Sequence, residues 1–136
     1  MTVGNAAFEA LVRPIPGLVA AGSYTTEATY QHHIVYLSAD YTVALATGST
    51  QALIGVLMNN PDTGQAAVVA GVGSIVKIKC AGAGISYGTK LTTDGSGQAI
   101  AVSSGTDTVI AIALAAATAG DFVVAYLCGG RTLAAS

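Results

Sequence analysis

The sequence predicts an all-β protein, a small closed or partly closed antiparallel β-barrel or sandwich with an extended N-terminal arm. Short runs of β-branched and aromatic residues recur along the chain, and turn-forming residues separate them about every dozen positions. One run, residues 122–128, is apolar on both of its alternating faces, which indicates a strand that is covered on both sides. The chain has 136 residues, which fits one domain.

The chain divides into an arm over residues 1–23, a β-barrel domain over residues 24–130 and a tail over residues 131–136. The arm is moderately apolar without clean alternation, and Pro14 and Pro16 prevent a continuous helix across it. A loosely packed terminus is the alternative interpretation of this segment.

From Tyr24 to Gln31 the residues alternate with a period of two, which predicts the first strand. Further strands are predicted over residues 34–37, 41–46, 52–58, 66–69, 75–80, 90–93, 98–102, 109–114 and 122–128. The clearest hairpin runs from Leu91 to Ile100, with Asp-Gly at its tip.

Composition excludes several classes of function. Hydrophobic residues make up 52% of the chain and charged residues only 9%, and the net charge is -2. The basic residues are scattered along the sequence, which disfavours a nucleic-acid partner. The sequence contains no run of about 20 apolar residues, so no membrane-spanning helix is predicted. Its first residues lack the basic region of a signal peptide, so we expect an intracellular product rather than an exported one. So sparsely charged a surface favours assembly into something larger.

Residues suited to catalysis or metal binding form no recognisable pattern. His32 and His33 are adjacent, so on a strand they point to opposite faces and do not share one metal ion. The seven acidic residues are dispersed, and the five aspartates sit singly in predicted turns, where Asp accepts hydrogen bonds from its own backbone. Cys80 and Cys128 are too few for a disulfide framework and are expected to be buried thiols. We therefore expect neither enzymatic activity nor a metal or other cofactor.

Aromatic residues gather in the first predicted strands, and tyrosine suits interfaces because its apolar ring carries a polar tip. Together with the outer face of residues 122–128, they give the candidate contacts between subunits. These candidates are Tyr24, Tyr30, Tyr36, Phe122, Val124 and Tyr126. Ordinary half-buried positions in a barrel are the alternative.

The central and C-terminal motifs resemble a known family. They are Ile54-Gly-Val-Leu57, Pro61-Asp-Thr-Gly-Gln-Ala66, Ile75-Val-Lys-Ile-Lys79, the run from Gly88 to Ala99, Ile110-Ala-Ile-Ala-Leu114 and the run from Ala117 to Val124. In this order they are similar to the small capsid decoration (cement) proteins of tailed bacteriophages. The resemblance covers residues 34–127.

The resemblance implies a structural virion protein without enzymatic activity. Such proteins are made in the host cytoplasm, bind the outer surface of the expanded head, commonly as homotrimers, and stabilise contacts between major capsid proteins. Some use an N-terminal arm that adds a strand to the shell. The arm residues that would contact the capsid here are Val3, Phe8, Leu11, Val12 and Ile15. The alternative function is that of a head- or tail-fibre adhesin domain that binds a host-surface glycan.

Overall fold

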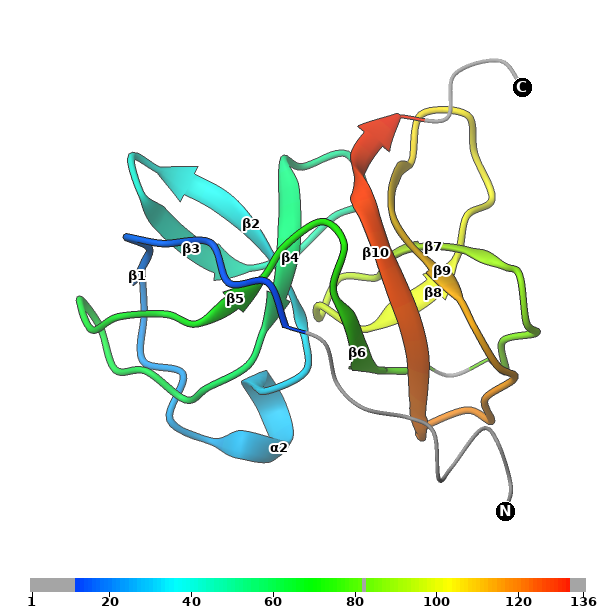
Figure 1. Cartoon of the computed structure of the whole chain (residues 1–136), viewed down its shortest axis with the longest axis horizontal. Helices are drawn as coiled ribbons and strands as arrows, with labels where there is room; N and C mark the ends of the chain where they lie inside the picture. The colour runs from blue at the N-terminus through cyan, green and yellow to red at the C-terminus, as the bar shows by residue number, and fades with distance from the viewer. Residues whose placement is uncertain (1–11, 82, 133–136) are drawn as a thin grey trace.

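The computed structural model describes residues 12–81 and 83–132, and within these ranges the chain forms two five-stranded β-sheets side by side (Figure 1). The all-β prediction is confirmed. The elements are β1 (Val19–Ala20), α2 (Glu27–Tyr30), β2 (Ile34–Ala39), β3 (Thr42–Leu45), β4 (Leu53–Leu57), β5 (Val69–Ala70), β6 (Ile75–Lys79), β7 (Lys90–Thr93), β8 (Ala99–Ala101), β9 (Thr108–Ala113) and β10 (Phe122–Thr132). No helix in this part of the chain is long and apolar enough to cross a bilayer.

The first sheet has the order β1-β3-β2-β4-β5. Its strands pair antiparallel, except that the short β1 runs parallel to β3. The β2–β3 hairpin turns at Tyr41, whose φ of 52° lies in the left-handed region. This turn leaves the Tyr41 ring 70% exposed.

The second sheet has the order β6-β10-β9-β7-β8, and all of its strand pairs are antiparallel. A bridge between Cys80, just after β6, and Ala99 in β8 brings the two edges of this sheet together. The Ala81 amide also donates to the Ala99 carbonyl oxygen over 3.1 Å. The second sheet is therefore a small, partly closed barrel.

The predicted hairpin between residues 91 and 100 is formed by β7 and β8. The Asp94 carboxylate accepts hydrogen bonds from the Ser96 and Gln98 amides, which stabilises the turn. The tip then packs on the first sheet, because the Ile34 amide donates to the Gly97 carbonyl oxygen over 2.7 Å. The hairpin thus connects the two sheets as well as forming an edge.

Residues 24–31, predicted as a strand, do not form one. The Thr26 carbonyl oxygen accepts hydrogen bonds from the Thr29 and Tyr30 amides, which gives the short helix α2, and His32 follows with a φ of 65°. The rings of Tyr24 and Tyr30 then pack against each other, with centroids 4.9 Å apart. The period of two was misleading here because local hydrogen bonds and ring packing favour a turn.

Residues 12–23 were predicted to belong to an arm separate from the barrel, but in the structure they lie against the first sheet. Pro14 bridges to Ala70, and the Ile15 amide donates to the Val69 carbonyl oxygen over 3.0 Å. Leu18 is only 4% exposed, and β1 is an edge strand of the first sheet. The segment from residue 12 onward is therefore extended, as predicted, but it belongs to the first sheet.

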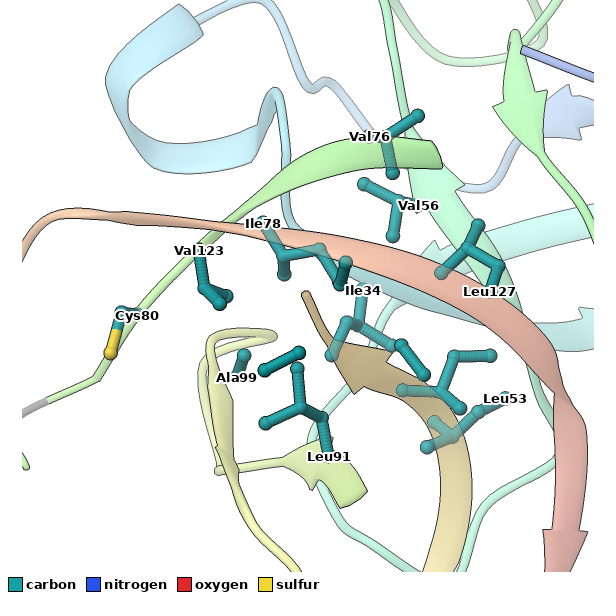
Figure 2. Packing of buried hydrophobic residues seen from close by; sticks show 14 of the residues in the cluster. Ile34, Leu53, Val56, Val76, Ile78, Cys80, Leu91, Ala99, Val123 and Leu127 are labelled. Carbon is teal, nitrogen blue, oxygen red and sulfur yellow. The ribbon is translucent and has the colours of Figure 1, made fainter. Parts of the chain in front are cut away.

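The main hydrophobic core lies between the two sheets (Figure 2). Ile34, Leu53 and Val56 from the first sheet meet Ile78 and Leu127 from the second. A smaller cluster lies on the other face of the first sheet, where Val35, the neighbour of Ile34, packs with Leu18, Val43, Leu57, Ala67 and Val69. The first sheet therefore carries a buried apolar cluster on each of its faces, whereas the described part of the second sheet contributes to the main cluster alone.

The Asp107 carboxylate locks the loop before β9 to the loop between β3 and β4. One oxygen accepts hydrogen bonds from the Ser103 and Ser104 amides at 3.0 Å, and the other accepts from the Ser49 hydroxyl at 2.7 Å. The Ser103 amide and the Ser49 hydroxyl bond to the ionised form, so they lower the pKa of Asp107 below its ordinary value of 3.8.

We expect Asp107→Ala to lower the free energy of unfolding by about 1–2 kcal/mol at pH 7, because the two amides lose their shared acceptor. The unfolded chain binds this proton at higher pH than the folded chain does. The difference between wild type and variant should therefore be constant above about pH 5 and shrink as the pH falls below 4. Urea unfolding across this pH range measures it. Asp62→Ala is the control, since within the described residues that carboxylate accepts a hydrogen bond only from the adjacent Thr63 amide. An equal loss of stability in both variants contradicts the role of Asp107 in joining the two loops.

Candidate docking surfaces

An apolar strip runs along the outer face of the second sheet. In β10, Val123, Ala125 and Leu127 point into the core, so Phe122, Val124 and Tyr126 point outward. Phe122 is 42% exposed and Tyr126 is 40% exposed. Half-exposed aromatic side chains in one row are typical of a surface that binds another protein.

Neighbouring strands widen this strip. Tyr126 pairs with Ile112 of β9, and the Leu114 amide donates to the Val124 carbonyl oxygen over 2.9 Å. Leu114 is 50% exposed. The strip therefore extends across β10 to the end of β9.

All three lysines of the chain lie on this face. Lys77 and Lys79 pair with Val124 and Phe122 across the β6–β10 ladder, and Lys90 pairs with Ile112. Each lysine alternates with a buried residue of its own strand and so points outward. We call the whole set the lysine-flanked face: Phe122, Val124, Tyr126, Ile112 and Leu114 with Lys77, Lys79 and Lys90.

The Phe122 ring is contacted by two neighbouring side chains. The Lys79 ammonium lies 5.2 Å from the centre of its ring, and the His32 ring meets it edge-on at 5.5 Å. The ammonium also donates to the Gly120 carbonyl oxygen. An aromatic side chain fixed in this way loses little conformational entropy on binding a partner.

A second apolar surface lies on the first sheet. It is a pocket of about 400 Å³ beside the β2–β3 turn. We call it the first-sheet pocket, and its lining residues are Ile15, Leu18, Leu37, Asp40, Tyr41 and Ile54. Asp40 is the one residue of this set that is charged at neutral pH. The pocket thus combines an apolar wall with an acidic edge.

The predicted interface residues fall into two groups. Phe122, Val124 and Tyr126 share the lysine-flanked face, as their alternation indicated. Tyr24 and Tyr30 are instead half-buried against the smaller core cluster, and Tyr36 packs against the main one. The Tyr24 hydroxyl also accepts a hydrogen bond from the Leu45 amide at 3.2 Å. These three tyrosines occupy the half-buried positions that were the alternative interpretation.

The predicted arm contacts are also divided. Val12 packs against the main core cluster and Ile15 against the smaller one, where Ile15 also lines the first-sheet pocket. Val3, Phe8 and Leu11 lie outside the described residues. Of the predicted arm contacts in the described chain, Ile15 is the one that reaches a candidate docking surface.

The histidines and Cys80, which the sequence offered as candidates for catalysis or metal binding, make contacts typical of structural residues. The His33 imidazole lies 2.9 Å from the Gln31 carbonyl oxygen, whereas the His32 ring contacts Phe122. Burial, with a smaller contribution from Asp121, raises the pKa of the buried Cys80 thiol, which keeps it protonated at neutral pH. Over residues 12–81 and 83–132, no three His, Cys, Asp or Glu side chains come together as a metal site would need.

Comparisons with known proteins support the fold. No protein-family model matches the chain, and no curated protein matches it in sequence. Among solved structures, the chain is similar to the N base of the head fibre gp8.5 in bacteriophage phi29, with a TM-score of 0.61 and 16% sequence identity. The match covers 90% of this chain and 98% of that one. The two chains share a fold over nearly their whole length.

Proposed function

We propose that this protein is a structural component of a tailed-phage virion, which binds the outer surface of the expanded head and stabilises contacts between major capsid proteins. The observation that supports it best is the fold shared with the base of a phage head fibre, in a chain whose motifs resemble capsid decoration proteins. Two exposed apolar surfaces on one small domain fit a protein that works in contact with others. In this function the protein needs neither a catalytic residue nor a cofactor.

The protein acts as a homotrimer in this proposal. The lysine-flanked face and the first-sheet pocket lie on different sheets, and each has an apolar centre. Their charges are opposite, since Lys77 and Lys79 flank one and Asp40 borders the other. A contact between unlike patches repeats around a closed ring, whereas a face packed against its own copy brings like charges together.

A trimer also explains how modest contacts hold the protein on a shell. Each copy adds one attachment to the capsid lattice, and linked attachments raise the overall affinity by about 10²–10⁴ without new contacts. The trimer axis matches the threefold positions of an icosahedral head, so all copies can bind equivalently.

The test is binding to expanded, DNA-emptied heads of the phage that encodes the protein. We expect saturable co-sedimentation at three copies per occupied threefold site, and much weaker binding to the unexpanded precursor shell. Absence of binding to heads, together with binding of the protein to host-surface glycans, contradicts the proposal and favours the adhesin function.

A further inference from the structure

A polar pocket lies where helix α2 and the start of β2 meet the tip of the β7–β8 hairpin. It is separate from both docking surfaces, and its volume of about 380 Å³ is at the lower end of the range of small-molecule sites. Its lining includes Thr29, Tyr30, His33, Leu45, Ser96 and Gln98. Three segments that are separate in the sequence, residues 29–33, Leu45 and residues 95–98, therefore converge on one small pocket.

His33 gives this pocket a defined hydrogen-bond acceptor. The side chain is 2% exposed, and Nδ1 lies 2.9 Å from the Gln31 carbonyl oxygen. A carbonyl oxygen only accepts, so Nδ1 holds the proton and Nε2 presents a lone pair. Nε2 makes no hydrogen bond with any residue of the described chain and is not sealed from solvent. Burial lowers the pKa of His33, so the ring is neutral at pH 7.

The hairpin side of the pocket supplies further polar groups. Asp94 binds the Ser96 and Gln98 amides, which holds the backbone of the tip. The Ser96 hydroxyl and the Gln98 side-chain amide form no hydrogen bond within the described chain, and neither does the Thr29 hydroxyl on the opposite wall. These groups can each donate and accept.

The apolar part of the lining is small and rigid. Tyr30 is held by its contact with Tyr24, and Leu45 lies beside it in the pocket wall. No residue that lines the cavity in the described chain carries a full charge at neutral pH. A phosphate, a carboxylate or an ammonium group therefore has no counter-charge among the lining residues, although Lys79 and Asp94 act on His33 from outside the lining. A neutral ligand with several hydroxyl groups and an apolar C–H face matches the lining better.

We propose that this pocket binds one neutral pyranose sugar, whose hydroxyl group donates to Nε2 of His33 and whose other hydroxyl groups pair with Ser96, Gln98 and Thr29. The C–H face of the ring packs against Tyr30. The site goes beyond the proposed capsid role and does not depend on it. The same sugar could be free or stand at the end of a glycan, so the test includes both.

The test is a titration of the ¹⁵N-labelled protein with the methyl glycosides of glucose, galactose, mannose and N-acetylglucosamine at millimolar concentrations. We expect saturable shifts of the amide signals of residues 29–33 and 94–98 for at least one sugar. The binding protein is then applied to a glycan array, where retention on glycans ending in that sugar identifies a glycan end as the source and no retention identifies the free sugar.

Variants separate a built site from weak surface binding. His33→Phe removes the hydrogen-bond acceptor. Gln98→Leu removes a side-chain amide that has no hydrogen-bond partner in the described chain, so this variant is expected to fold even if His33→Phe does not. Each should weaken binding by at least about tenfold. Ser86→Ala, at an exposed position outside the pocket, should leave it unchanged. No saturable shift with any of the sugars, or equal affinity in Gln98→Leu and Ser86→Ala, overturns the proposal.

Discussion

Replacing Gly55 with alanine is expected to prevent the first sheet from forming in its present register. Gly55 lies in β4, which pairs with β5 at Val56 and Leu57. A Cβ atom at this position would be 2.0 Å from the Ala70 carbonyl oxygen and 2.7 Å from a methyl carbon of Val69. The nearer atom belongs to the backbone, so no side-chain rotation relieves the overlap.

We expect the Gly55→Ala substitution to lower the free energy of unfolding by at least about 3 kcal/mol, at the upper end of overpacking effects. This is a large part of the roughly 5–15 kcal/mol that stabilises a typical domain. Urea unfolding followed by circular dichroism measures it, and loss of the cooperative transition is the extreme form of the same result.

Gly48→Ala is the matched control for this substitution. Apart from its neighbours in sequence, no atom of the described chain lies within 4 Å of a Cβ built at Gly48. The free energy of unfolding of the Gly48→Ala variant should therefore differ from wild type by no more than about 0.5 kcal/mol. If the two variants are equally stable, the close approach of β4 and β5 is not a feature of the native protein.

Residues 122–128 show what a single strand of sequence can predict. Their two apolar faces indicated a strand covered on both sides, either in the middle of a barrel or by a neighbouring subunit. The structure places Val123 and Leu127 in the core and leaves Tyr126 40% exposed, so the described chain covers one face of the strand. The rest of the lysine-flanked face could not be predicted in this way. Leu114 and Lys90 come from other strands, and only the pairing register brings them beside β10.

The clustering of the lysines on one face could not be predicted from the sequence. Lysines that are scattered in the sequence share one face in the fold, because Lys77 and Lys79 are two residues apart on a strand and Lys90 enters from the far side of β9. The first-sheet pocket could not be predicted from the sequence either. It forms because Ile15 pairs beside β5 and because the turn at Tyr41 exposes the ring of this tyrosine. Such sites depend on long-range pairing, which local patterns of hydrophobicity do not encode.

Negative charge at the centre of the lysine-flanked face is expected to disrupt assembly. Phe122→Asp combined with Tyr126→Asp places two carboxylates in the apolar centre of the lysine-flanked face. We expect this double variant to remain folded, because both side chains point away from the core. Its self-association should weaken by at least about 100-fold, as for the loss of two central interface aromatics. Its binding to expanded heads should fall by about 10²–10⁴, because avidity is lost.

Sedimentation velocity over a range of concentrations measures the association, with Val68→Asp as the control. Val68 and Tyr126 are both 40% exposed, but Val68 lies on neither docking surface. The control should sediment as the wild type does. A double variant that sediments as the wild type does shows that this face makes no contact between copies.

We propose that neighbouring copies on a viral shell complete this protein, and an image of expanded heads incubated with the protein decides whether they do. We expect density for three copies around each threefold position, in which the lysine-flanked face of one copy lies against the first-sheet pocket of the next. Undecorated heads, or isolated copies with β10 facing solvent, would show that neighbouring copies do not complete the protein.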